Sequence, residues 1–351
     1  MAFQRAFEID LRSDTVTKPD AAMRAAMADA EVADDVLDHD PTMRRLEEEV
    51  AGLLGCEAAV WVPSGSMGNA IALMLHLRRG DRYLAPEHAH VIGSELGTAA
   101  WLAQGMPHPL PHDAGPGRPT AETVRAAVGG AAPYYALTPS LLCIENTHNF
   151  AGGAVVPEAE WSALVTTAHD LGLRVHLDGA RVWNAAVAHG VPLHRLADGA
   201  DTVQVCLSKG LGAPVGSVLA ADAARIKDAR RIRKMLGGGV RQGGVLAAAG
   251  LVALRGIERL ADDHTNAQRL ATGLREQGWQ VNDPETNIVL ADTEDTADPA
   301  ATVHRLAEQG IGAVIAAGRV RFVTHRDVDA SEIEAVLERV TVERVTGIEP
   351  A

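Results

Sequence analysis

The sequence has few cysteines, few aromatic residues and no long apolar run. Its three cysteines, Cys56, Cys143 and Cys206, lie far apart and form no CxxC pair. This spacing argues against a zinc site or a disulfide framework and favours reduced thiols in a cytoplasm. The longest apolar stretch, residues 243–254, is well short of the roughly twenty residues that span a bilayer. The first residues lack the apolar core of a signal peptide, so we expect a cytoplasmic protein without a membrane partner.

Positive charge is also scarce. Lys and Arg number 32 and Asp and Glu number 46, which gives a formal net charge of −14. A surface this acidic repels phosphate backbones, so nucleic acid is not an expected partner. The chain has 351 residues, of which 47% are hydrophobic and 22% charged. It is therefore long enough for about two globular domains with sizeable cores.

Apolar runs of strand length alternate with helical patterns through most of the chain. This alternation is typical of βα units and a mainly parallel sheet. Asp40 and Pro41 predict the start of a helix that ends at Gly55, because Asp is a good N-cap and Pro fits the first turn. We expect further strands at residues 58–62, 141–145, 175–178, 203–207 and 216–220, and further helices at about 66–77, 161–171, 223–235 and 243–254.

The pattern changes near Arg255. After it we expect a long polar helix at residues 258–277, followed by strands at 288–291 and 320–324 that alternate with helices at 300–309 and 331–340. We therefore predict a large α/β domain over residues 1–248, which includes an N-terminal segment. A small C-terminal α+β domain is predicted over residues 249–345.

Polar residues gather where the predicted strands end. Unpaired polar groups are costly inside a sheet, and a doubly wound sheet binds its ligands outside the carboxyl ends of its strands. Four segments of this kind occur, at residues 64–66, 145–149, 178–181 and 208–210. We therefore look for the functional site among these four segments.

Lys209 follows the apolar run 203–207 and precedes a glycine-rich turn, outside any helical pattern. One interpretation is a lysine in an ion pair at the end of a strand. The other is a Schiff-base lysine, because a desolvated amine is easily made nucleophilic. This segment alone leaves both open.

Asp178 and Arg181 follow another predicted strand. Pyridoxal 5′-phosphate (PLP) needs a carboxylate against its ring nitrogen, because a protonated ring is an electron sink. Asp178 can supply it, and Arg181 can donate to the ring's phenolic oxygen or to a substrate carboxylate. A local ion pair between the two is the alternative. Residues 64–66, between a strand and a helix, offer backbone N–H groups to a phosphate, and with Lys209 these features indicate a PLP site.

Seven motifs in chain order carry a resemblance to a known family. They are DLRSDTVT at 10–17, PSGSMGN at 63–69, ENTHN at 145–149, HLDGAR at 176–181, LSKGLGAPVGS at 207–217, GGGVRQ at 237–242 and VRFVTH at 320–325. From Asp10 to about Val340, the chain resembles the low-specificity L-threonine aldolases, within the fold-type I PLP-dependent β-eliminating lyases. The resemblance implies a fold-type I large domain, a mainly parallel sheet and a small C-terminal domain.

The resemblance also implies an activity. It is the reversible cleavage of L-threonine, L-allo-threonine or a related β-hydroxy-α-amino acid to glycine and an aldehyde. Lys209 would be bonded to PLP, His90 would stack on its ring, and His148 would lie near the substrate hydroxyl as the base, assisted by His90. The alternative is another PLP-dependent lyase, racemase or transaldolase that acts on a β-substituted amino acid.

The remaining implied roles concern binding. The substrate carboxylate would be held by Ser13, Arg181 and Arg321. The phosphate would be contacted by Gly65, Ser66 and Ser208. Two further residues, Lys234 and Arg241, would reach the phosphate from a neighbouring subunit. The family is a homotetramer built as a dimer of dimers, with active sites at the dimer interface, and we expect the same here.

Each of these assignments has a simpler alternative. His88 and His90 form an HxH pair, but no Cys or carboxylate lies at ligand spacing, so we expect no metal. His148 could be a structural histidine, Arg321 a surface charge and residues 237–239 only a flexible loop. We expect Trp61 and Trp101 in the core.

One segment departs from the family. The family's tyrosine-glycine pair is replaced by Leu37-Asp38-His39. This segment helps to shape the active site, so the departure bears on substrate preference.

Overall fold

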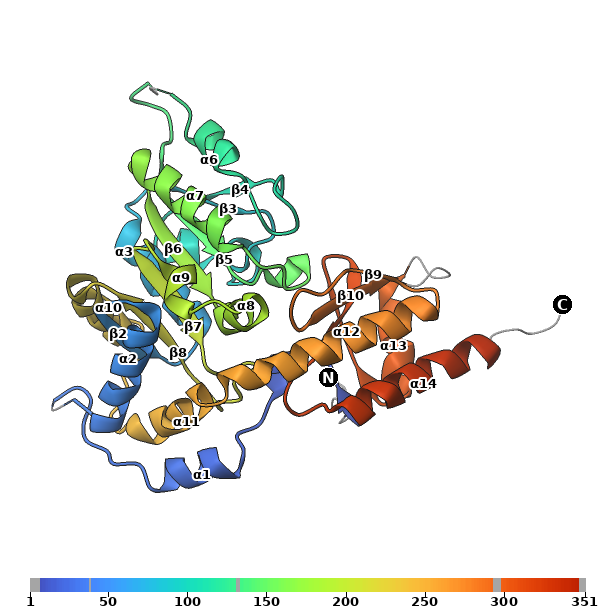
Figure 1. Cartoon of the computed structure of the whole chain (residues 1–351). Coiled ribbons are helices and arrows are strands. Elements are labelled where there is room, and N and C mark those ends of the chain that lie inside the picture. The colour runs from blue at the N-terminus through green and yellow to red at the C-terminus, as the bar shows by residue number, and fades with distance from the viewer. Residues whose placement is uncertain (1–6, 38, 131–132, 293–297, 347–351) are drawn as a thin grey trace.

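The computed structural model describes residues 7–37, 39–130, 133–292 and 298–346, with only the backbone of residues 341–346 (Figure 1). Asp38, in the segment that departs from the family pattern, lies outside the described residues. Two parts lie side by side in Figure 1: a large α/β part and a smaller C-terminal part, connected by the long helix α12 (Leu260–Glu276). Among the described residues, no helix has both the length and the apolar character needed to cross a membrane.

The large part is built on a seven-stranded sheet of order β2-β8-β7-β6-β5-β3-β4. Its strands are β2 (Ala58–Val62), β3 (Arg82–Pro86), β4 (Met106–Leu110), β5 (Pro139–Glu145), β6 (Arg174–Gly179), β7 (Thr202–Cys206) and β8 (Ser217–Ala221). β8 runs opposite to its neighbours β2 and β7, and the other six strands share one direction, so the sheet is mainly parallel. The predicted α/β fold class is confirmed.

Helices cover both faces of this sheet. Along β2, Val60 and Val62 pack in one hydrophobic cluster with α3 (Gly65–His76) and α10 (Ala223–Met235), whereas Trp61 between them belongs to another cluster. Successive side chains of a strand point to opposite faces, which explains this division. The other helices of this part are α1 (Ala21–Ala28), α2 (Pro41–Leu54), α4 (His90–Gly93), α5 (Thr98–Trp101), α6 (Ala121–Val128), α7 (Glu158–Asp170), α8 (Val182–His189), α9 (Leu193–Ala197) and α11 (Gly244–Leu254).

Of the two tryptophans expected in the core, one is there. Trp61 is 1% exposed, but Trp101 is 76% exposed at the end of the four-residue helix α5. So short a helix presents little surface to the core, and only Ala99 of its residues is buried. The prediction for Trp101 is therefore wrong in this chain taken alone.

The C-terminal part has its own sheet and core. Its antiparallel sheet has the order β12-β13-β10-β9, from β9 (Gln280–Val281), β10 (Ile288–Asp292), β12 (Val314–Ala316) and β13 (Arg319–Val323). Around it lie α12, α13 (Pro299–Glu308) and α14 (Ala330–Thr346). The N-terminal strand β1 (Ile9–Asp10) pairs with β11 (Ile311–Gly312), and Ile9 and Leu11 lie in this core. The division at residues 248 and 249 stays a prediction, to which the structure adds this N-terminal contact.

The predicted N-cap of α2 does more than begin a helix. One carboxylate oxygen of Asp40 accepts hydrogen bonds from the backbone N–H groups of Thr42 and Met43, both at 3.0 Å. The other oxygen accepts from Ala33 at 3.2 Å and from Gly244, the first residue of α11, at 3.0 Å. Asp40 is fully buried, so this one carboxylate joins three segments.

We expect Asp40→Ala to lower the free energy of unfolding by about 3 kcal/mol, because four N–H groups, three of them buried, lose their acceptor. Urea-induced unfolding would measure the loss. Asp298→Ala is the matched control, because Asp298 caps α13 through a single exposed N–H group, that of Ala300, and its loss should cost about 1 kcal/mol. Equal losses in the two variants would contradict the joining role of Asp40.

Candidate active site

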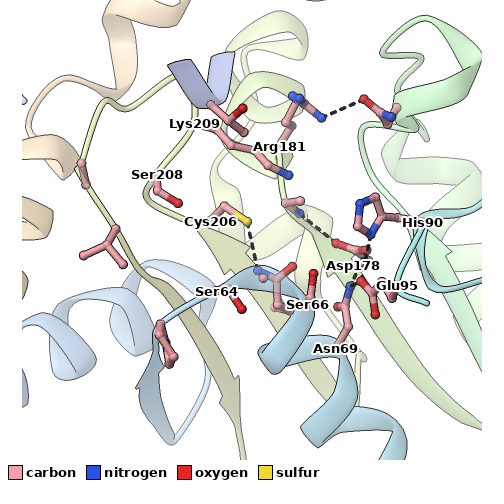
Figure 2. Close-up of a pocket in the computed structure, with 18 of the residues that line it drawn as sticks. Ser64, Ser66, Asn69, His90, Glu95, Asp178, Arg181, Cys206, Ser208 and Lys209 are labelled. Atoms are coloured by element: carbon pink, nitrogen blue, oxygen red, sulfur yellow. Dashed lines mark hydrogen bonds and ion pairs between the residues drawn. The ribbon is translucent and has the colours of Figure 1, made fainter. Parts of the chain in front are cut away.

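A cavity of about 370 Å³ lies at the carboxyl edge of the large sheet (Figure 2). Parallel strands bring their ends to one edge, and the register places Glu145 of β5 beside Asp178 of β6, and Asp178 beside Gln204 of β7. All three line the cavity. Of the predicted site residues, those that line it are Gly65, Ser66, His90, Asp178, Arg181, Ser208 and Lys209.

One end of the cavity is the N-terminus of α3. Ser64 caps this helix by accepting a hydrogen bond from the N–H of Met67 at 3.2 Å. The N–H groups of Gly65 and Ser66 have no acceptor among the described residues. A Cβ atom at Gly65 would lie 2.8 Å from the Sγ atom of Cys206. The glycine thus lets the backbone lie against the sheet, and free N–H groups at a helix N-terminus suit a phosphate.

Asp178 and Lys209 project into the same cavity (Figure 2). The buried Asp178 carboxylate accepts hydrogen bonds from the backbone N–H of Ala180 at 3.2 Å and from Nδ2 of Asn69 at 2.8 Å. Within the described part of the chain, the Lys209 amine forms no ion pair and no side-chain hydrogen bond. The simpler interpretation, a lysine held in an ion pair at the end of a strand, is therefore not supported, because Lys209 has no ion-pair partner among the described residues.

These groups fit PLP. A phosphate would meet the free N–H groups of Gly65 and Ser66, a ring nitrogen would meet the carboxylate of Asp178, and an aldehyde would meet the unpaired amine of Lys209. The backbone of Gly65 lies so close to Cys206 that a larger residue would not fit. This observation supports a phosphate-binding role for the start of α3. A single cavity therefore offers the three contacts that PLP requires.

Two arginines lie next to each other beside this cavity. Arg181 forms a buried two-point ion pair with Asp14, with both N···O distances at 2.7 Å. The Oδ1 atom of Asn149 accepts hydrogen bonds from Arg181 at 3.2 Å and from Arg321 at 2.9 Å. Burial and the neighbouring Arg181 lower the pKa of Arg321 to about 10. Two guanidinium groups face one compensating carboxylate, an excess of positive charge that suits a substrate carboxylate.

His90 is held by two carboxylates. Its Nδ1 atom lies 2.8 Å from Oε1 of Glu95, and its backbone N–H donates to Glu145 at 2.7 Å. Burial lowers the pKa of His90, but the hydrogen bond to Glu95 and the charges of Asp178, Glu145 and Glu95 raise it more, so the net shift is upward.

The ligand atoms of His90, Glu95 and Asp178 lie within 4.8 Å of one another, a spacing that could hold a metal ion. Asn69 donates hydrogen bonds to both of these carboxylates at 2.8 Å. The partly positive N–H hydrogens of Asn69 thus occupy carboxylate oxygens of Glu95 and Asp178 that a cation would need as ligands. The absence of a metal stays a prediction, which this geometry favours.

His148 lies apart from the cavity, and its role as the base stays a prediction. We expected it beside the substrate hydroxyl, but its ring is fully buried, does not line the cavity and packs edge-on against His112, with 5.3 Å between ring centroids. Neither ring nitrogen has a hydrogen-bond partner among the described residues, and burial lowers the pKa of His148. Asn149, the next residue, has the side chain that reaches the site.

Four other predicted residues lie outside the lining. Ser13 caps the short helix at Asp14–Val16, and Arg321 lies behind Asn149. Lys234 lies beside Gly239, and Arg241 pairs with Asp34 at 3.0 Å. The roles of Lys234 and Arg241 toward a neighbouring subunit stay predictions.

No role was assigned from the sequence to three residues that hold the site together, Asp14, Asn69 and Glu95. Asp14 and Asn69 lie inside two of the quoted motifs, so a search for partners of the buried Arg181 and Asp178 could have found them. Glu95 follows α4 in a stretch without a recognisable pattern, and nothing in the sequence points to it.

Comparison with known proteins agrees with this geometry. Residues 10–296 match the family described as β-eliminating lyases. The chain is 42% identical to low-specificity L-threonine aldolase 1 of Arabidopsis thaliana, with 98% of each chain covered. It is 40% identical to the low specificity L-threonine aldolase of Escherichia coli, over 93% of this chain and 97% of that one. The chain belongs to the β-eliminating lyase family.

Solved structures of this fold agree with the assignment. The threonine aldolase of Leishmania major superposes with a TM-score of 0.82 at 19% identity, covering 96% of this chain and 99% of that one. The serine palmitoyltransferase of Sphingomonas wittichii gives a TM-score of 0.74 at 19% identity, covering 97% and 88%. At such low identity these likenesses show the fold alone, and they confirm the expected fold-type I architecture of this lyase-family chain.

The Asp14–Arg181 pair predicts a pH dependence of stability. Burial opposes ionisation of Asp14, but Arg181 outweighs it and holds the pKa of Asp14 well below its ordinary value of 3.8. Since the folded-state pKa is the lower one, the ionised carboxylate stabilises the fold above about pH 4, and this contribution is lost as the pH falls further. Asp14→Asn should lower the free energy of unfolding by about 3 kcal/mol near neutral pH.

Unfolding of the wild type and Asp14→Asn, measured at several pH values, would test this. The difference between them should narrow below about pH 4. Glu48→Gln, which removes the exposed pair with Arg44, is the control and should change stability little at any pH. A constant difference for Asp14→Asn across the acid range would count against the ion pair as its cause.

Proposed function

We propose that the protein is a PLP-dependent lyase that cleaves L-threonine, L-allo-threonine or a related β-hydroxy-α-amino acid to glycine and an aldehyde, reversibly. The observation that carries the proposal is one cavity lined by the unpaired Lys209 amine, the Asp178 carboxylate and Arg181, with Arg321 joined to Arg181 through their shared partner Asn149. The relatives named as low-specificity L-threonine aldolases support this substrate class.

The residues of the cavity divide the work of holding PLP. Lys209 would hold its aldehyde carbon and Asp178 its ring nitrogen, with His90 against the ring. The phosphate would lie at Gly65, Ser66 and Ser208. When bound, PLP supplies an electron sink for the electron pair released as the Cα–Cβ bond of the substrate breaks.

The arginines fix the orientation of the substrate. A guanidinium group binds a carboxylate through two parallel hydrogen bonds, which set angle as well as distance. Asp14 and Asn149 hold Arg181 and Arg321 in place before substrate arrives, so little entropy is lost on binding. With its carboxylate fixed, the substrate presents the bond to be broken in one direction.

His90 is the proposed base for the β-hydroxyl proton. Its Nδ1 atom is engaged by Glu95, which leaves Nε2 as the nitrogen available to accept a proton. The carboxylates that raise its pKa also stabilise the protonated ring. His148, buried outside the cavity, does not have this access.

We further propose a homo-oligomer, a dimer of dimers with active sites at the dimer interface, in which Lys234 and Arg241 contact a neighbour's phosphate site. Neither residue lines the cavity of its own chain, which supports this arrangement. A cytoplasmic location is also proposed, supported by the three free cysteines.

Aldol cleavage and its alternatives, elimination, racemisation or transaldol chemistry, share Lys209 and Asp178, so products must distinguish them. We expect the purified protein, supplied with PLP, to release glycine and aldehyde from L-threonine, L-allo-threonine and β-phenylserine. Lys209→Ala should abolish this release, because no other described amine lines the cavity. Ammonia and a keto acid as the products, or full turnover in Lys209→Ala, would overturn the proposal.

The two histidines give a matched pair of variants. His90→Ala should lower kcat about 100-fold, the range typical of a lost general base. His148→Phe should change kcat by less than about threefold, because a buried ring without hydrogen-bond partners is replaced by an apolar one. Steady-state kinetics with L-threonine would measure both. The reverse ranking would restore His148 as the base.

A further inference from the structure

The side chain of Asn69, on α3, lies at the wall of the cavity with every polar atom engaged (Figure 2). Its Nδ2 atom donates to Oε1 of Glu95 and to Oδ2 of Asp178, both at 2.8 Å. Its Oδ1 atom lies 3.1 Å from Nε2 of His176. Asn69 is 2% exposed, so water does not compete for these contacts.

The partners fix which way the amide faces. Ionised carboxylates only accept hydrogen bonds, so the NH₂ group must point to Glu95 and Asp178, and the oxygen to His176. His176 must therefore carry its proton on Nε2, and its Nδ1 accepts from Oγ1 of Thr202 at 2.9 Å. Burial lowers the pKa of His176 to about 4, which keeps the ring neutral as this pattern requires. One arrangement of protons therefore satisfies the whole chain.

Glu95 depends on Asn69 for its orientation. Its Oε1 atom receives hydrogen bonds from Asn69 and from Nδ1 of His90, and its buried Oε2 atom has no partner among the residues described. Asp178 has only one other donor in the described chain, the N–H of Ala180 at 3.2 Å. A single NH₂ group thus connects the carboxylate that faces the cavity with the carboxylate that holds His90.

We propose that Asn69 is a positioning residue that holds Asp178 and, through Glu95, His90 in the orientations that PLP and substrate require. This inference rests on the proposed function. Asn69 does not itself take part in the reaction, because both hydrogens of its NH₂ group and its oxygen already form hydrogen bonds. Its effect is to aim the Asp178 carboxylate at the ring nitrogen of PLP.

A cofactor analogue isolates this effect. In 1-deaza-PLP a carbon replaces the ring nitrogen, so the analogue keeps the aldehyde and phosphate contacts but loses the contact with Asp178. We expect the wild-type full chain to bind PLP more tightly than the analogue. In Asn69→Ala the preference should fall about tenfold, the value of one hydrogen bond to a charged group, with the affinity for the analogue nearly unchanged.

Titration of the cofactor-free full chain, followed by tryptophan fluorescence, would measure these affinities. Asn266→Ala is the control, since Asn266 is also buried and bonds the carbonyl of Val328 in the C-terminal part. It should keep the full preference. Asn69→Asp, of the same size but repelling both carboxylates, should lose the preference too and covers the case in which Asn69→Ala does not fold.

The outcomes separate the two proposals. A wild type that binds neither compound would refute the proposed function itself. A wild type that prefers PLP, with Asn69→Ala and Asn69→Asp keeping that preference, would overturn the role of Asn69 alone. Weakening of PLP and the analogue by the same factor would mean that Asn69 only stabilises the fold.

Discussion

The buried ion pair between Arg181 and Asp14 is the contact on which the site's architecture depends. An arginine buried at the end of β6 would be untenable without a carboxylate, and the carboxylate comes from the N-terminal segment. That segment continues from β1, which belongs to the C-terminal core. Arg321 arrives from β13 and shares Asn149 with Arg181. The contacts that compensate the charge of Arg181 therefore bring the N-terminal segment, the loop after β5 and β13 together at one edge of the large sheet.

The polar groups of the site fall into two kinds. Some hold the backbone in place through hydrogen bonds within the protein, and others are left free to bind a ligand. Glu145 is buried and satisfied by two backbone N–H groups, those of His90 and Asn149, so it positions two loops. In contrast, the amine of Lys209 and the N–H groups that begin α3 have no partner among the described residues, and they face the cavity. Buried polar groups are normally paired. The groups without a partner here are half-buried or exposed at the cavity wall, so they remain open to a ligand.

The sequence predicted five of the seven strands described in the large sheet and missed β3 and β4, which lie together at one end of it. β2 and β5 to β8 were found because their apolar runs are almost wholly buried, whereas β4 was missed. Its sequence, MPHPL, carries two prolines and mostly exposed residues. Proline is tolerated there because β4 is an edge strand. Edge position does not by itself decide the outcome, because β2 forms the other edge, is buried over most of its length and was predicted.

The functional site, too, could be predicted from the sequence only in part. Topology brings residues at strand ends together, so Asp178 and Lys209 could be predicted from position alone. Asn69 and Asp14 act through contacts that span 109 and 167 residues, and no local pattern encodes such partners. The position of His148 shows a different limit, because the motif that contains it was recognised correctly. A motif specifies which residues follow a strand, but the path of the loop decides which of two neighbours turns inward. Here Glu145 fixes the backbone of Asn149, whose side chain then meets the arginines, and His148 packs beneath His112 instead.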